Sequence, residues 1–337
     1  MAPLVSILLP IYNGASTLDE ALDSVAAQTM GDFEIVVVDD GSTDDTPALL
    51  QRRANPRTRV ISSTHVGLLE ALNLGLEACR APYVARLDAD DICLPQRLER
   101  QLSIMEGDDS IAVCGTQVEA FPANDIAEGF HIYVQWQNDL VTHDDICREI
   151  FIESPIAHPS SMMRRLELVE MGAYQERGWA EDYDLWLRYH AAGRRFAKVA
   201  EPLVWWREHE ARATRTDSRY SIENFLRAKS HYLCSGPLAT RDGLILWGAG
   251  RTGRRLSKHL IRAGHRPDAF VDIAPNRIGS TMRGVPIIGP DDVAESWQSL
   301  RRPLLLAAVA SRGARARIRD HLTRLGLVET IDFLCVA

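Results

Sequence analysis

Short apolar runs alternate with amphipathic stretches along the first third of the chain. The apolar runs are rich in β-branched residues and cover 4–9, 34–38, 60–61 and the residues from Tyr83 onward. The amphipathic stretches between them cover 17–28, the residues from Asp45 onward, and 67–78. The first of these opens with Thr17-Leu18-Asp19-Glu20, which has the form of a helix capping box. Because such continuous apolar runs are typical of strands buried on both faces, we predict an α/β fold with a mostly parallel sheet and helices on both faces.

Polar residues follow three of the predicted strands. These groups are Tyr12-Asn13 after Pro10, then Asp39-Asp40, and then the segment 88–91. In parallel α/β sheets, ligands bind beyond the carboxyl ends of the strands. We therefore expect the three groups to converge in one crevice.

Three carboxylates, those of Asp88, Asp90 and Asp91, lie within four positions. Carboxylates this close repel one another in a partly buried site, so a cation among them would explain the cluster. Oxygen ligands favour Mg²⁺ or Mn²⁺ over zinc. The alternative interpretation is a solvated acidic turn after an edge strand.

The composition is that of an ordinary globular protein. The chain has 337 residues, of which 46% are hydrophobic, and this length favours two domains. No apolar run approaches the length needed to span a membrane, so we expect a cytoplasmic protein. The six cysteines are scattered without CxxC spacing, which indicates neither a disulfide framework nor a zinc site.

Charge is distributed unevenly along the chain. Residues 241–337 hold 16 Lys or Arg against 9 Asp or Glu, whereas residues 1–240 hold 22 against 37. This asymmetry supports a domain boundary close to Ser235-Gly236-Pro237. The basic residues lack interleaved aromatic residues, so they do not indicate nucleic-acid binding.

The last 97 residues begin with a different motif. The apolar run 244–247 is followed by Gly248, Gly250 and Gly253 in GxGxxG spacing, then by a predicted helix to about Ala263 and by Asp272 after a second apolar run. A strand, this glycine motif, a helix and an acid about twenty residues on are typical of nucleotide-binding sites. The stretch has room for about half of a full dinucleotide fold. Nucleotide or nucleotide-sugar binding and a docking or oligomerisation module both stay open.

Several segments, in this order, resemble the family 2 glycosyltransferases of the GT-A fold, over nearly all of residues 1–235. They are 5–13 (VSILLPIYN), 37–44 (VVDDGSTD), 71–73, 87–91 (LDADD), 95–98, 158–160, 180–186 (AEDYDLW) and 206–209 (WREH). The stretches 272–279 and 284–288 look like the small Rossmann-like domains of sugar acyltransferases and other polysaccharide enzymes. We thus expect a GT-A glycosyltransferase domain over 1–235 and a Rossmann-like domain over 241–337.

The resemblance implies roles for the residues in the expected crevice. Tyr12 would lie against the donor base, Asp40 would accept a hydrogen bond from a pyrimidine imide, and Asp88 would face the ribose. Asp90 would bind the metal, and His209 would reach the metal or the diphosphate from the far side. The donor-site residues implied in this way, together with those of the C-terminal motif, are Pro10, Tyr12, Asn13, Asp39, Asp40, Asp88, Gly248, Gly250, Gly253 and Asp272. The alternative for Asp39 or Asp40 is a helix-cap or turn residue before Gly41-Ser42.

The acidic helix start at Glu181-Asp182 would supply the base. The resemblance places removal of the acceptor proton on Asp182, with Glu181 as a neighbour that raises its pKa or touches the acceptor. The alternative is helix capping, since acidic side chains are favoured at helix starts. The resemblance also puts His158 and Arg164 near the acceptor or the donor sugar. One base without a carboxylate nucleophile implies single-step displacement with inversion.

We therefore predict a Mn²⁺- or Mg²⁺-dependent inverting glycosyltransferase that uses a nucleotide sugar, a UDP-sugar by preference. The expected acceptor is a hydroxyl of a carbohydrate or lipid-linked glycan, and the family's commonest setting is bacterial surface polysaccharide. A nucleotidyltransferase and a non-catalytic nucleotide-sugar sensor or scaffold are the alternatives. Peripheral membrane association and a homo-oligomer formed through the C-terminal domain both stay open.

Overall fold

The computed structural model describes residues 3–123, 126–210 and 212–337. The chain forms two compact units. The N-terminal unit comprises Met1–Ile146, Ser154–Arg177 and Glu181–Thr216, and the C-terminal unit comprises Cys147–Glu153, Gly178–Ala180 and Asp217–Ala337. The helix α10 (Ile222–Ser235) thus groups with the C-terminal unit, whereas the sequence suggests a boundary after it.

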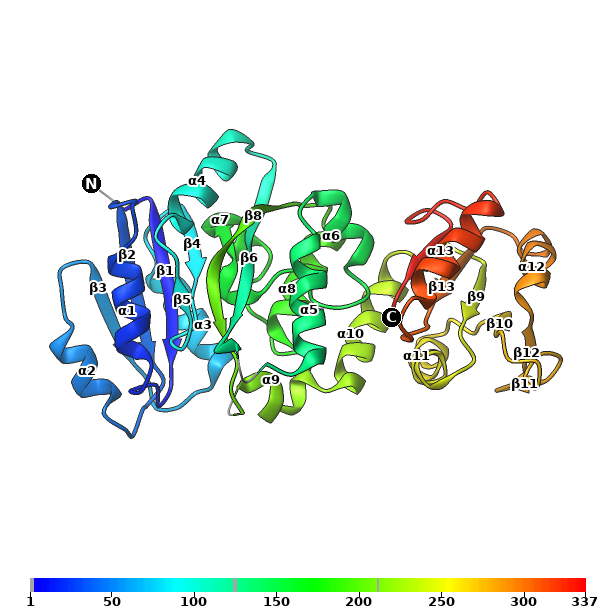
Figure 1. The fold of residues 1–337 in the computed structure, drawn as a ribbon, viewed down its shortest axis with the longest axis horizontal. Coiled ribbons are helices and arrows are strands. Elements are labelled where there is room, and N and C mark those ends of the chain that lie inside the picture. The colour runs from blue at the N-terminus through cyan, green and yellow to red at the C-terminus, as the bar shows by residue number, and fades with distance from the viewer. Residues whose placement is uncertain (1–2, 124–125, 211) are drawn as a thin grey trace. The chain divides into compact units, whose positions relative to one another are not determined.

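The N-terminal unit is built on an eight-stranded sheet in the order β3-β2-β1-β4-β7-β6-β8-β5 (Figure 1). The strands are β1 (Val5–Ile11), β2 (Phe33–Asp39), β3 (Thr58–Ser62), β4 (Tyr83–Arg86), β5 (Ile92–Cys93), β6 (Ile111–Phe121), β7 (Met162–Arg164) and β8 (Arg195–Arg207). The first four strands of the order are parallel, as the apolar pattern predicts. The strands β7 and β5 pair antiparallel with their neighbours, so the sheet as a whole is mixed.

Helices connect and cover these strands. They are α1 (Leu18–Ala26), α2 (Thr46–Arg52), α3 (Leu68–Ala78), α4 (Arg97–Gly107), α5 (Glu128–Asp139), α6 (His143–Glu149), α7 (Arg165–Glu170), α8 (Glu181–Ala191) and α9 (Ala213–Thr216). The predicted capping box at Thr17 is wrong, because the Thr17 hydroxyl donates back to the Gly14 carbonyl and caps no amide of α1. None of the helices in the described residues is long and apolar enough to cross a membrane.

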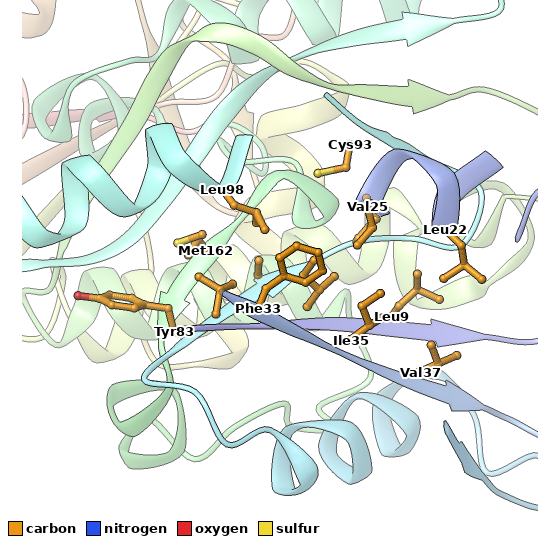
Figure 2. Close-up of a cluster of buried hydrophobic side chains, with 14 of the residues drawn as sticks. Leu9, Leu22, Val25, Phe33, Ile35, Val37, Tyr83, Cys93, Leu98 and Met162 are labelled. Carbon is orange, nitrogen blue, oxygen red and sulfur yellow. The ribbon is translucent and has the colours of Figure 1, made fainter. Parts of the chain in front are cut away.

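The core of the N-terminal unit lies against the parallel strands. Figure 2 shows Leu9, Ile35 and Val37 from β1 and β2 packed with side chains of α1 and α4. Gly75 of α3 lies where the helix crosses the strands. A side chain would not fit at this position, because a Cβ there would lie 2.2 Å from Leu8 Cδ1. This close approach fixes α3, and with it the loop that precedes α3, on the sheet.

The C-terminal unit holds a six-stranded sheet in the order β11-β12-β10-β9-β13-β14. Its elements are β9 (Gly243–Trp247), α11 (Arg251–Arg262), β10 (Ala269–Val271), β11 (Thr281–Met282), β12 (Val285–Ile288), α12 (Val293–Ser299), β13 (Pro303–Ala307), α13 (Ala314–Arg324) and β14 (Phe333–Cys335). Every pair except β11 with β12 is parallel. The first strand, β9, lies in the middle, with its successors on both sides, which is the doubly wound arrangement.

Candidate active site

The carboxyl ends of β1, β2 and β4 lie side by side, as predicted. The parallel register pairs Ile11 with Asp39, and Leu8 with Arg86. Hydrogen bonds join the loops that follow β1 and β2. The Asn13 N–H donates to Ser42 Oγ (2.8 Å), and the Thr43 N–H donates to Asn13 Oδ1 (2.8 Å). Residues far apart in sequence therefore form one rim.

Asp40 anchors the loop that leads into α3. Its buried carboxylate accepts hydrogen bonds from Ser63 Oγ (2.6 Å), from the Val66 N–H (2.7 Å) and from the Gly67 N–H (2.8 Å). The loop presents His65, whose ring stacks on that of Tyr12 with centroids 4.0 Å apart. His65 Nδ1 also lies 3.3 Å from Asp40 Oδ2, so groups of the protein occupy the roughly four acceptor positions of this carboxylate. Asp40 shapes the place where a base would bind.

Pro10 and Asp39, two further residues predicted at the donor site, are also buried. Pro10 lies inside β1 with no exposed face, opposite Val38 of β2. Asp39 is 4% exposed, and its Oδ1 accepts the Ser42 N–H (3.0 Å). This bond is that of a turn residue, the alternative interpretation of Asp39. Both residues support the loops that follow β1 and β2.

The acidic segment after β4 forms a compact cluster. Carboxylate oxygens of Asp88, Asp90 and Asp91 lie within 4.8 Å of one another. The His209 Nε2 atom lies 2.8 Å from Asp90 Oδ2, although 119 positions separate the two residues. The structure thus brings together Asp90 and His209, the two residues predicted to bind a metal.

Asp91 is the most buried member of the cluster. Burial, followed by the charges of Asp90 and Asp88, holds the pKa of its carboxyl well above the ordinary value. Its Oδ1 accepts the Arg207 N–H (2.7 Å), but its buried Oδ2 has no hydrogen-bond partner among the described residues. Three crowded carboxylates with an unpaired buried oxygen fit the binding of a divalent cation.

Two arginines, for which the sequence indicated no role, donate hydrogen bonds to residues of the acidic cluster. Arg86, 1% exposed, donates from Nη2 to Asp88 Oδ1, while its Nε and Nη1 are buried without a partner in the described chain. Arg207 donates from Nε to the Asp90 carbonyl (2.6 Å). For Arg86, the sequence offered one signal, a charged residue inside an apolar run. A fully buried arginine is rare unless it is paired, so this position could have been predicted to contact an acid.

The start of α8 presents Glu181 and Asp182. Glu181 is buried, with Oε1 3.9 Å from His158 Nδ1, and His158 Nε2 lies 3.2 Å from the Tyr174 hydroxyl. Burial, followed by the charge of Arg86, holds the pKa of His158 well below its ordinary value, so this imidazole is neutral at pH 7. Asp182 is half-buried, and its carboxylate accepts from the Tyr183 N–H (2.7 Å) and from Ser154 Oγ (3.4 Å).

One residue expected near the substrates lies elsewhere. Arg164 pairs in register with Tyr83, the first residue of β4, whereas the acidic cluster follows the last. Its guanidinium donates to the Ile111 carbonyl (2.9 Å) and to the Tyr83 hydroxyl (3.1 Å). The expectation for Arg164 is wrong because β7 runs antiparallel to β4. This places Arg164 at the amino end of β4, whereas the acidic cluster follows the carboxyl end.

Comparison with known proteins identifies the family. Residues 6–172 match the model of glycosyl transferase family 2. The amylovoran biosynthesis glycosyltransferase AmsE of Erwinia amylovora is 33% identical over 206 residues, which cover 60% of this chain and 75% of that protein. The chain belongs to glycosyltransferase family 2. This confirms the resemblance drawn from the N-terminal motifs.

Two further matches agree with this membership. An Escherichia coli UDP-Gal:α-D-GlcNAc-diphosphoundecaprenol β-1,3-galactosyltransferase is 28% identical over 250 residues, 72% of this glycosyltransferase and 88% of that enzyme. The structure of S. aureus TarS 1–349 in complex with UDP-GlcNAc superposes with a TM-score of 0.57 at 17% identity, over 77% of this chain and 72% of that one. The second match supports the GT-A-like mixed sheet.

The chain is thus a glycosyltransferase of class EC 2.4 that takes its sugar from a nucleotide sugar. The family model ends at residue 172, before α8 and before the C-terminal unit begins its sheet. The resemblance of the C-terminal stretch to acyltransferase domains stays a prediction, as do the roles of the individual site residues.

Proposed function

We propose that this glycosyltransferase is metal-dependent and inverting, and that it moves a sugar from a UDP-sugar to a hydroxyl of a carbohydrate or lipid-linked glycan. The observation that carries the proposal is the acidic cluster after β4. Asp90 and His209 are in contact there, and Asp91 Oδ2 has no hydrogen-bond partner within residues 3–123, 126–210 and 212–337. A solvated acidic turn would leave none of its carboxylates buried, whereas Asp91 is 1% exposed.

The donor nucleotide would lie across the rim formed by the loops after β1, β2 and β4. Tyr12, 46% exposed, offers an aromatic face for the base, and its stack on His65 fixes the orientation of that face. Asp88, held by Arg86, offers a carboxylate to the ribose. The galactosyltransferase named for UDP-Gal and the TarS complex with UDP-GlcNAc support a uridine nucleotide.

Asp90, Asp91 and His209 would hold Mn²⁺ or Mg²⁺. Once bound, the cation would neutralise the charge that grows on the departing nucleoside diphosphate. Arg86 balances part of the acidic charge through Asp88, and the Arg207 backbone fixes the orientation of Asp91. These two arginines therefore pre-organise the carboxylates before any ligand arrives.

Asp182 would take the proton from the acceptor hydroxyl. Its contacts with the Tyr183 N–H and with Ser154 Oγ orient the carboxylate at the start of α8. Glu181 lies buried beside a neutral His158, with Oε1 3.9 Å from its Nδ1, and could contact the acceptor next to Asp182. A single base suits displacement in one step, with inversion at the anomeric carbon.

A synthesis pathway for a surface polysaccharide is the setting that we propose. The support is the name of the amylovoran biosynthesis relative and that of the galactosyltransferase acting on a diphosphoundecaprenol-linked sugar. An acceptor of this kind carries both a glycan and a lipid.

A donor screen tests the proposal. Thermal shift with nucleoside diphosphates and their sugars, with and without Mn²⁺, should single out UDP-sugars, because a ligand that binds the folded state stabilises it by mass action. The selected donor is then incubated with candidate acceptors, and NMR reads the anomeric configuration of the product. Retention would overturn the inverting mechanism. Release of a sugar 1-phosphate, the leaving group when the acceptor attacks phosphorus, would indicate a nucleotidyltransferase, and binding without turnover would indicate a sensor.

A further inference from the structure

The C-terminal unit contains a cavity of its own, of about 690 Å³. It lies at the carboxyl ends of β9, β10 and β13, where Trp247, Val271 and Ala308 line it. β9 has β10 on one side and β13 on the other, so the strand order reverses at β9. Ligands of doubly wound sheets bind at such a point of reversal, beyond the carboxyl ends of the strands. The volume falls in the range of small-molecule sites.

The glycine turn after β9 forms one wall of this cavity. Gly248 has φ +129°, a conformation that side chains disfavour, and a Cβ on Gly253 would lie 1.8 Å from the Gly248 carbonyl oxygen. The turn therefore packs directly against the first turn of α11. This helix is 12 residues long and no side chain caps it, so its first amides face a place suited to an anion.

Basic side chains surround the same cavity. Arg251, Arg277, Arg317 and Arg324 line it, against the two acids Asp272 and Asp320. Arg277 Nη1 donates to Asp272 Oδ2 (2.9 Å) and lies 3.7 Å from the position of a Cβ on Gly250. A guanidinium is thus held over the glycine turn, with further N–H groups for a phosphate.

The other wall is apolar. Ile273 is 76% exposed at the cavity, beside Val309 and Ile318. His321 stacks edge-on against Trp247 with ring centroids 5.2 Å apart, and its Nε2 is buried without a hydrogen-bond partner in the described residues. A ligand that fits both walls has a polyanionic part and a flat ring that packs on apolar side chains.

A dinucleotide fits less well than a single nucleotide. In dinucleotide sites, the acid after the second strand binds the ribose hydroxyls. Here Asp272 Oδ1 accepts the Ala274 N–H (2.9 Å) and Oδ2 accepts from Arg277, so both oxygens are engaged. Asp272 thus binds Arg277, whereas the acid of a dinucleotide site would bind a ribose.

We propose that this cavity binds a nucleoside diphosphate, free or as its sugar ester, at a second site in the chain. The diphosphate lies between the glycine turn and Arg277, and the base lies against Ile273 and Ile318. This site uses no metal, because arginines and helix amides supply the positive charge. It thereby differs from the donor crevice, where the acidic cluster would need a cation.

The test uses the full chain carrying Asp90→Ala, in EDTA, so that metal-dependent binding at the donor crevice is removed. Calorimetry with UDP, UDP-GlcNAc, ADP, NAD⁺ and inorganic pyrophosphate should show one site for a nucleoside diphosphate. Arg277→Gln and Gly250→Ala should each weaken it at least tenfold, since the first removes the cation and the second narrows the turn. Arg262→Gln, on the exposed last turn of α11, is the matched control and should leave the affinity unchanged.

Three results would overturn the proposal. One is the absence of nucleotide binding to the Asp90→Ala chain at millimolar ligand, and another is binding that Arg277→Gln and Gly250→Ala leave intact. The third is a preference for NAD⁺ or for pyrophosphate over UDP and ADP, which would assign a different ligand class. Each variant's thermal midpoint is measured, and Gly250→Ala should fold because nothing lies closer than 3.7 Å to its Cβ. Failure here leaves the glycosyl-transfer proposal standing, since that depends on metal-dependent binding in the wild-type chain.

Discussion

His209 Nε2 lies 2.8 Å from Asp90 Oδ2, and this contact connects two parts of the N-terminal unit that are 119 positions apart in the sequence. It exists because β5, which begins directly after the acidic segment, pairs antiparallel with β8, which ends shortly before His209. A histidine beside a carboxylate is a usual pair of metal ligands once a cation joins them. The same pairing positions Arg207 over the backbone of Asp90.

Asp90→Ala should abolish the increase in UDP affinity that Mn²⁺ produces, because the cation would bridge this carboxylate and the diphosphate. The loss in transfer rate should correspond to several kcal/mol of transition-state stabilisation. Calorimetry with and without Mn²⁺ measures the first effect. Asp109→Ala, at a side chain 96% exposed, is the matched control. Metal-dependent binding that survives in Asp90→Ala would exclude Asp90 as a ligand.

Asp182→Asn should slow transfer by about 10² to 10⁴ while donor affinity changes little, since Asn keeps the geometry but cannot take the proton. Asn caps a helix about as well as Asp, so a capping role alone predicts wild-type stability and rate. The single-turnover rate at saturating donor separates the two. A rate within about threefold of wild type would remove Asp182 from the mechanism.

The sequence predicts the convergence of the strand ends because parallel strands must align their carboxyl ends at one edge. It also predicts the pairing of Asp90 with His209, although through the family resemblance. Arg86, His65 and Arg207 escape prediction, since each acts through contacts set by strand order or by a loop conformation. The capping box at Thr17 fails for a related reason: a hydroxyl can bond a nearby carbonyl as readily as an amide, and local sequence does not decide between them.

Lys198 should make stability depend on pH in a way that one substitution removes. It is buried, donating to the Pro155 carbonyl (3.0 Å), and burial lowers its pKa from 10.5 to about 7. Between these two pKa values the unfolded chain binds a proton that the folded chain releases, so the free energy of unfolding rises as the pH rises. As the pH falls toward 7, the stability that the neutral amine contributes is lost. The slope is at most about 1.4 kcal/mol per pH unit.

Urea denaturation from about pH 7 to pH 9 should therefore show the wild type gaining stability relative to Lys198→Met as pH rises. Lys258→Met, at a half-exposed position, is the control and should run parallel to the wild type. Equal slopes for Lys198→Met and wild type would mean that the amine keeps its proton in the folded state. Comparing variants at each pH cancels the opposite trend expected from the buried Cys79 and Cys114, whose pKa values burial raises to about 12.

A fragment ending at Ser235 should be unstable. Glu149, 3% exposed, forms ion pairs with Arg315 and Arg319, which this truncation deletes. Removing the partner of a buried charge typically costs about 3 to 5 kcal/mol. Arg148, whose Nε lies 3.5 Å from Glu149 Oε1, stays in the fragment and should offset part of that cost. Soluble yield and thermal midpoint measure the effect, and Glu149→Gln in the fragment should restore part of the loss. An unmodified fragment as stable as the full chain would show that residues 1–235 fold independently, as the charge boundary in the sequence suggests.

The hydrogen bonds of Asp40 to the loop before α3 should be detectable by hydrogen exchange. The amides of Val66 and Gly67 belong to a connecting segment, where exchange with deuterium is ordinarily fast. Both are bound to a carboxylate that is itself 3% exposed, and the helix that follows is locked to the sheet at Gly75. These two amides should therefore exchange as slowly as those of the neighbouring strands, even without nucleotide. The face that receives the base would then be rigid from the outset, so nucleotide binding would lose little entropy in ordering it.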